Sequence, residues 1–208
     1  EEIQLIEWWI NEGAPINKTF NQIKVNTTVQ GLLFKNYCLD TREKPWYEKV
    51  KLKPLTDDVF LELEKHNFIS RTLSTDNSLL DIRYHGNNLK DKDLNVLYKY
   101  APYITWLNLS DCGLRDGQLK NLPKMENLTR LYLHQNKIKT SSLKPLINLK
   151  HLEILNLHST NINKEIFELI NSFENLKKVY LWNTLLTSKD LLNQANKYEN
   201  IELIGGLE

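Results

Sequence analysis

LTRLYLHQNKI, residues 128–138, decides the fold, because the chain repeats its pattern of apolar residues at a nearly constant spacing. Leucine or isoleucine occupies the first, fourth, sixth and eleventh positions, and a small polar residue occupies the ninth. Four further segments fit the pattern LxxLxLxxNxL, and successive starts lie 25, 24, 24 and 24 residues apart: LLDIRYHGNNL (79–89), ITWLNLSDCGL (104–114), LEILNLHSTNI (152–162) and LKKVYLWNTLL (176–186). A degraded match, IELIGGLE, begins at Ile201. Such a period predicts structural units that stack on one another.

Each unit is expected to form a short strand, a turn and a helical return segment. One unit cannot bury its own apolar face, so stacking must join the strands into a parallel sheet with continuous internal ladders of leucine. The pattern resembles that of leucine-rich repeat proteins and predicts an α/β fold over residues 79–208, with a parallel sheet on the concave side and short helices on the convex side. One ladder is predicted to contain Ile82, Leu107, Leu131, Leu155 and Val179.

The return segments carry their own helical spacing of apolar residues, which predicts short α-helices or 3₁₀ turns. The spaced residues are Leu94 and Leu97, Leu119 and Leu122, Leu143 and Leu146, Ile166 with Leu169 and Ile170, and Leu191 with Leu192. The ninth position of the pattern reads Asn87, Cys112, Asn136, Thr160 and Thr184. Their short side chains can bond to the backbone of neighbouring turns, so Cys112 is interpreted as a buried structural residue.

The first 78 residues predict a helical extension and cap. Residues 1–15 have the spacing of an amphipathic helix, and residues 16–55 are interpreted as a connector whose basic end lies against the next domain. Residues 56–78 predict a helix capped at Thr56 or Asp57 and a strand at residues 69–73. This helix and strand are expected to cap the repeats by covering an otherwise open sheet edge.

LIEWWINEGAP (residues 5–15) resembles the closing helix of cytochrome c-like domains in large planctomycete and Bacteroidetes envelope proteins. LKPLTDDVFLELEKHNFISRTLSTDNSLLDIRY (residues 52–84) is similar to the junction that precedes their leucine-rich region. The resemblance implies a larger exported parent protein that carries covalent haem and lies in the cell envelope or periplasm. It also implies that residues 1–15 are a remnant of the cytochrome c-like domain of that parent. The sequence has no CxxCH motif for haem attachment, since Cys38 is followed by Leu39 and Asp40. We therefore expect no cofactor in this chain, although haem is possible in its parent.

Composition narrows the partner classes. The 208 residues contain 27 Lys and Arg against 26 Asp and Glu, so the chain has no general attraction to nucleic acid or anionic lipid. No apolar stretch approaches the roughly 18 residues of a membrane span, so direct membrane insertion is not expected. The two cysteines allow at most one internal disulfide, and Cys38 has no evident partner.

Residues between the leucines are predicted to face the concave surface, because side chains alternate along a strand. Three columns result: Asp81, Trp106, Arg130, Ile154 and Lys178; then Arg83, Asn108, Tyr132, Asn156 and Tyr180; then His85, Ser110, His134, His158 and Trp182. Aromatic and arginine side chains are enriched at binding hot spots. The candidate binding residues are Arg83, Trp106, Arg130, Tyr132, His134, His158, Tyr180 and Trp182. Alternatively, the aromatic residues only cover the sheet by packing on one another.

His134 and His158 are expected to be neighbours on adjacent strands. They could share a metal ion, with Asp111 as the nearest third ligand, or form a pH-sensitive patch. No acidic residue or cysteine in their column completes a ligand set, so no metal site is predicted.

The sequence contains no GxSxG, HExxH, CxxC or glycine-rich phosphate motif, and we expect no enzyme activity. The predicted function is a non-catalytic binding or scaffold module that contacts a protein, a ligand or other domains of its parent chain through its concave face. One alternative is a docking module for electron transfer by a haem-bearing domain of the parent. A second alternative is carbohydrate binding through the Trp and Tyr rows.

Overall fold

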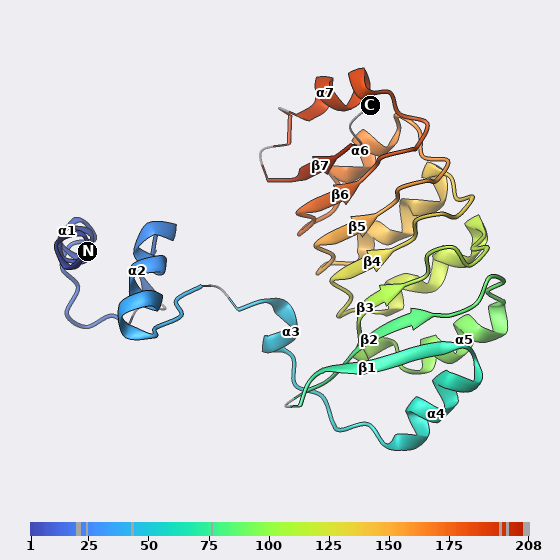
Figure 1. Ribbon diagram of the computed structural model, residues 1–208, viewed down its shortest axis with the longest axis horizontal. Helices are drawn as coiled ribbons and strands as arrows, with labels where there is room; N and C mark the ends of the chain where they lie inside the picture. The colour runs from blue at the N-terminus through green and yellow to red at the C-terminus, as the bar shows by residue number, and fades with distance from the viewer. Residues whose placement is uncertain are drawn as a thin grey trace. The chain divides into compact units, whose positions relative to one another are not determined.

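The protein is described here by a computed structural model that covers residues 1–19, 22–23, 25–42, 44–75, 77–195, 197–198 and 200–205 (Figure 1). The chain divides into two compact units. Unit 1 is Glu1–Pro45 and unit 2 is Trp46–Glu208. The last three residues of the degraded repeat, 206–208, lie outside the described part.

Among its described residues, unit 1 contains the helices α1 (Glu2–Asn11) and α2 (Thr27–Tyr37). Helix α1 confirms the helix predicted within residues 1–15. A small cluster of Trp8, Val29 and Leu33 is buried between the helices, and a few partly buried side chains pack against it.

Helix α2 lies within residues 16–55, which were interpreted as a connector without a helix being predicted there. The Asn26 side chain accepts a hydrogen bond from the Val29 N–H and so caps the first turn. Cys38 ends the helix in the left-handed conformation, with φ of 53°. Gly31 within the helix obscured its apolar period in the sequence.

Unit 2 is built on a seven-stranded sheet in sequence order, and this confirms the predicted α/β class. β1 pairs with β2 in the antiparallel direction, and each later neighbouring pair is parallel. The strands are β1 (Phe68–Ser74), β2 (Asn77–Tyr84), β3 (Ile104–Asn108), β4 (Arg130–Tyr132), β5 (Ile154–Asn156), β6 (Lys178–Tyr180) and β7 (Glu202–Ile204).

The predicted ladder is present. Leu107, Leu131, Leu155 and Val179 are paired in register on adjacent strands and are fully buried. Beyond the strand ends, the backbone ladder continues, since Leu133 N–H donates to the Asn156 carbonyl at 2.9 Å. The turn after each strand has the same backbone conformation in four consecutive sequence repeats, with a positive φ at Asp111, Gln135, Ser159 and Asn183.

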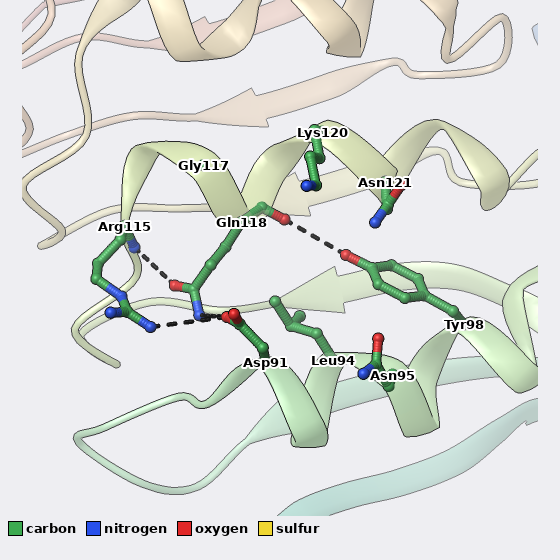
Figure 2. A pocket seen from close by; sticks show the side chains of 9 residues that line it. All are labelled: Asp91, Leu94, Asn95, Tyr98, Arg115, Gly117, Gln118, Lys120 and Asn121. Carbon is green, nitrogen blue, oxygen red and sulfur yellow. Dashed lines mark hydrogen bonds and ion pairs between the residues drawn. The ribbon is translucent and has the colours of Figure 1, made fainter.

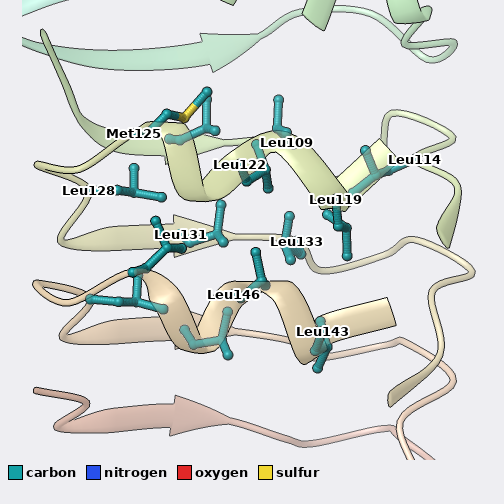
Figure 3. Packing of buried hydrophobic residues seen from close by; sticks show 14 of the residues in the cluster. Leu109, Leu114, Leu119, Leu122, Met125, Leu128, Leu131, Leu133, Leu143 and Leu146 are labelled. Carbon is teal, nitrogen blue, oxygen red and sulfur yellow. The ribbon is translucent and has the colours of Figure 1, made fainter. Parts of the chain in front are cut away.

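Helical segments cover one face of the sheet, where leucines from both layers interdigitate (Figure 3). Proline at positions 123 and 145 removes a backbone N–H and disfavours the α-helical bonding pattern, in keeping with the 3₁₀ form of the two segments that contain it. The segments that follow the strands confirm the predicted helical returns: α5 (Asp91–Lys99), η2 (Ala101–Tyr103), η3 (Asp116–Lys124), η4 (Thr140–Asn148), α6 (Ile166–Ile170) and α7 (Ser188–Ala195).

In the later sequence repeats, the side chains at the ninth position of the leucine pattern form the predicted hydrogen bonds to the backbone. Buried Asn136 donates to the Leu109 and Leu133 carbonyls at 2.7 and 3.0 Å and accepts from the Cys112 and Leu114 N–H groups. Thr160 and Thr184 each donate to the carbonyl three residues earlier. Asn87, by contrast, is exposed.

Two elements precede the first repeat strand as predicted. Helix α4 (Asp57–Lys65) begins after Thr56, and β1 lies along the edge of β2. Val59, Leu63 and Phe68 join the main core, so this end of the sheet is covered by packed side chains. Helix α3 (Trp46–Lys49) also belongs to unit 2.

Candidate binding surface

The sheet face opposite the helices carries the three predicted columns of outward side chains, and we call it the open sheet face. Strand register places Asp81, Trp106, Arg130, Ile154 and Lys178 side by side, and it aligns Arg83, Asn108, Tyr132, Asn156 and Tyr180 in the same way. Most of these side chains are half-buried, whereas Arg83 is exposed.

Trp106 and Arg130 form the first close group on this face. The Arg130 guanidinium carbon lies 4.0 Å from the centroid of the Trp106 ring, which is the geometry of a cation–π contact. The Trp106 Nε1 is buried and has no hydrogen-bond partner among the described residues. The indole is thus held by packing, with the guanidinium on one side of its ring.

Four rings form the second group, a row that begins at Tyr132 in β4 and continues through residues just beyond the ends of β4, β5 and β6. Ring centroids lie 6.4 Å apart between Tyr132 and His134, 4.5 Å between His134 and His158, and 5.1 Å between His158 and Trp182. The first two contacts are edge to face, and the last is stacked with an interplanar angle of 20°. Trp182 ends the row and is 51% exposed.

Burial keeps the two histidines of this row neutral at neutral pH. Desolvation lowers the pKa of His134 first, and the charges of His158 and Arg83 lower it further, while Asp111 opposes them. Desolvation also lowers the pKa of His158. The Nδ1 atoms of both histidines are buried, and no residue that the structure describes forms a hydrogen bond with them.

The histidine pair does not extend to a metal-ligand set in the part of the chain that the structure describes, where no group of three or more His, Cys, Asp or Glu side chains is suitably placed. Its neighbours are the rings of Tyr132 and Trp182.

The structure therefore brings together six of the eight candidate residues in two groups. Arg83 and Tyr180 lie on the same face but take part in neither group. Arg83 acts on the ring row through its charge, which disfavours protonation of His134.

Sequence reasoning missed two residues of this surface, Trp46 and Tyr47 in α3. The Trp46 ring stacks on His151 with centroids 3.5 Å apart, and its Nε1 donates to the Asn127 side chain at 2.9 Å. Tyr47 meets the Trp106 ring edge to face at 6.0 Å. The signal was a Trp-Tyr pair beside a proline in a basic segment, because adjacent aromatic residues seldom stay solvated.

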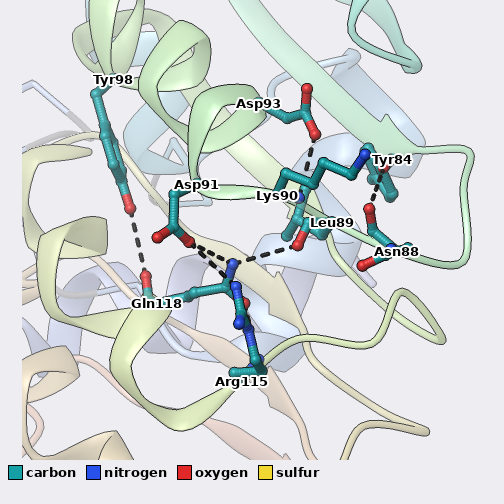
Figure 4. A network of polar contacts seen from close by, with 9 residues as sticks. All are labelled: Tyr84, Asn88, Leu89, Lys90, Asp91, Asp93, Tyr98, Arg115 and Gln118. Carbon is teal, nitrogen blue, oxygen red and sulfur yellow. Dashed lines mark hydrogen bonds and ion pairs between the residues drawn. The ribbon is translucent and has the colours of Figure 1, made fainter.

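A polar groove of about 550 Å³ lies on the helix side, between α5 and η3 (Figure 2). Gln118 links its walls: Nε2 donates to the Leu89 carbonyl at 3.2 Å and to Asp91 at 2.7 Å, and Oε1 accepts from the Arg115 N–H (Figure 4). Burial, followed by the charge of Asp91, raises the pKa of Tyr98 to about 12, so its hydroxyl stays protonated and donates to the Gln118 carbonyl.

A similar groove of about 400 Å³ recurs between η4 and α6, lined by Thr140, Lys144 and Glu168 among others. Because the same kind of hollow appears between successive helical segments, it arises from their stacking. The groove at Gln118 is consequently a structural junction, and the open sheet face is the candidate site.

A histidine and a carboxylate also meet away from this face, where His66 Nδ1 lies 2.8 Å from Asp93 Oδ1. The other oxygen of Asp93 accepts from the Lys90 N–H and caps α5 (Figure 4). The pair joins the ends of two helices, which is a structural role.

No protein-family model matches the chain, and no curated protein matches its sequence. Among the described helices, none has both the length and the apolar character needed to cross a bilayer.

Proposed function

We propose that unit 2 is a leucine-rich repeat solenoid whose open sheet face binds a protein partner, and that the chain is a non-catalytic binding module. Four observations support the repeat architecture. Sequence units of 24 or 25 residues each supply one strand, the strands pair in register, their leucines form one buried ladder, and the turn conformation recurs.

The observation that carries the binding role is the ring row that ends at Trp182. Its rings are carried at or just beyond the ends of adjacent strands of a packed sheet and contact one another, so ordering them for a partner costs little further conformational entropy. Large aromatic side chains with a polar atom contribute most at protein interfaces. Trp182 leaves about half of its surface free for such a contact.

The partners of the two histidines support binding over catalysis. His134 and His158 contact rings, whereas an acid–base histidine needs a nucleophile or an orienting carboxylate within hydrogen-bond reach. The His–Asp pair of His66 and Asp93 caps a helix instead.

A protein partner is also favoured over a carbohydrate. Sugar binding by stacking needs free ring faces, and the Trp106 ring has Arg130 over one face and Tyr47 at its edge. The alternative role, docking a haem-bearing domain of a larger exported protein, depends on the sequence resemblance alone. Absorbance spectra of the natural full-length protein would test that alternative through the presence or absence of a haem band.

The binding proposal is tested with a random peptide library displayed on phage and selected on the full chain. Bound phage are then competed with soluble wild-type protein, with the Trp182→Ala and Tyr132→Ala double variant, or with Lys144→Ala as a control on the helix side. We expect the double variant to compete at least about tenfold less well than the control. Equal competition by all three proteins would contradict binding at the open sheet face.

A further inference from the structure

Charges on the open sheet face are unevenly paired. Asp81 is engaged by Arg71 of β1, with 2.8 Å between the charged atoms, and Lys178 is engaged by Glu202 of β7 at 2.7 Å. The ion pairs formed within the described residues include neither Arg83 nor Arg130. These two guanidinium groups are the unneutralised charges of the three columns.

Arg130 is prepared to bind a planar anion. Its contact with Trp106 holds the guanidinium carbon 4.0 Å from the ring centroid, and a guanidinium can donate a forked pair of hydrogen bonds to a carboxylate. The low polarity of the neighbouring indole strengthens such a charge-assisted bond. A carboxylate fits this fork.

Arg83 extends the positive charge along the face. Two strand spacings and two residues along the strand separate Arg83 from Arg130, so their backbone positions lie about 12 Å apart. In an extended peptide at about 3.3 Å per residue, side chains four residues apart lie on the same side about 13 Å apart, so that distance matches carboxylates at a spacing of four residues. The ring row begins at Tyr132, beside Arg130 on the same strand, and continues to Trp182.

We propose that the open sheet face binds an acidic peptide segment in which two carboxylates pair with Arg83 and Arg130 and an adjacent aromatic or apolar side chain packs on the ring row. This inference rests on the proposed protein-binding function and adds the chemistry of the partner. The segment lies across the strands, with its carboxylates over β2 to β4 and its apolar residue toward β6.

The peptides selected by the face-specific competition test this inference. We expect them to be enriched in Asp or Glu at a spacing of four residues, followed by an aromatic or large aliphatic residue. Synthetic versions are then titrated against the full chain by fluorescence anisotropy. Changing both acids to their amides should weaken binding at least tenfold, as should Arg130→Gln, with a smaller loss for Arg83→Gln.

Arg42→Gln is the matched control, because Arg42 is an exposed arginine of unit 1 already paired with Asp40. It should leave the affinity unchanged. Circular dichroism of each variant distinguishes lost binding from lost folding.

The outcomes separate the two proposals. Peptides that need Trp182 but have no acidic enrichment, and that bind Arg130→Gln normally, would leave the binding function intact and overturn the acidic partner. Selected peptides that ignore Trp182 and both arginines would overturn both. Tighter binding of a mixed-sequence single-stranded oligonucleotide than of the acidic peptides would also overturn the acidic peptide, because the arginines would then serve phosphate.

Discussion

The two units bury their apolar residues in different ways. Unit 2 shares one continuous core to which each strand and each helical segment except α3 contributes, and most ladder side chains in it have no exposed surface. Unit 1 buries only Trp8, Val29 and Leu33 among its described residues, while Ile3, Ile6 and Ile10 of α1 stay more than half exposed. In unit 2, each further sequence repeat adds apolar side chains to the same core. Two short helices bury too little apolar surface to offset the conformational entropy that is lost when they fold.

The largest expected effect concerns the two cysteines, one in each unit. Cys38 is an exposed free thiol, and Cys112 is a buried free thiol whose pKa burial raises to about 12. In native protein, we expect a thiol reagent to modify Cys38 on the order of 10³ times faster than Cys112, because Cys112 reacts only after unit 2 opens. Mass spectrometry of timed samples measures both rates.

Comparable labelling of the two cysteines without denaturant would contradict a closed core in unit 2. Cys38→Ser and Cys112→Ser variants assign the two rates. The Cys112 rate in the Cys38→Ser variant should rise steeply with urea.

Shortening a ladder side chain should have the next largest effect. Leu131→Ala leaves a cavity in a fully buried position and should lower the free energy of unfolding of unit 2 by about 3 kcal/mol. Leu192→Ala, at a side chain 73% exposed, is the control and should change it by less than about 0.5 kcal/mol. Urea denaturation followed by circular dichroism compares them, and equal stability of the two variants would refute the ladder.

Removing the buried side-chain amide of Asn136 should lower the free energy of unfolding of unit 2 somewhat less than Leu131→Ala does. Asn136→Ala leaves the Cys112 and Leu114 N–H groups and the Leu109 carbonyl without this partner and should destabilise unit 2 by about 2 kcal/mol. Asn148→Ala serves as the control, because exposed Asn148 donates only to a carbonyl in its own turn. A loss no greater than that of the control would show that the Asn136 amide does not join adjacent units.

The smallest expected effect is a dependence of stability on pH. Burial lowers the pKa of His134 and His158 below 6.5 in the folded protein. The two histidines therefore bind protons more readily in the unfolded chain than in the folded protein. Their contribution to the stability of the folded state is complete above pH 6.5, and it declines as the pH falls through the unfolded and then the folded pKa. Unit 2 should unfold at lower urea at pH 5.5 than at pH 7.5.

The double variant His134→Gln and His158→Gln should have a weaker pH dependence than the wild type. His85→Gln is the control, since His85 is an exposed histidine in the same column. An identical pH dependence in the double variant and the wild type would show that the ring row does not hold the two histidines in their neutral form.

Sequence alone was sufficient for the parts of the fold that depend on periodic burial. The leucine spacing predicted the strands, the helical returns and the buried ladder, because each unit has the same environment as its neighbours. It missed α2, where a glycine interrupts the period and the defining feature is the Asn26 cap. It predicted a connector lying against the next domain but not the contacts of Trp46 with His151 and Asn127, because these join residues far apart in the chain.

The same limit applies to the candidate surface. Alternation along the strands placed all eight predicted residues on one face, and the register aligned them. Sequence could not show that Arg130 stacks on Trp106, or that Asp81 and Lys178 are neutralised by Arg71 and Glu202. Those contacts depend on rotamers and on neighbours from the first and last strands.

The claim that unit 2 is one stack with a shared core is tested most directly by hydrogen exchange of the backbone amides that join neighbouring strands. The N–H groups of Leu109, Leu133, Leu157 and Leu181 each donate to the carbonyl of the next strand. We predict that all four exchange slowly and at similar rates, through a common opening that also governs Cys112 labelling. Exchange of Leu133 and Leu157 as rapid as that of the amides in α1 would contradict the account.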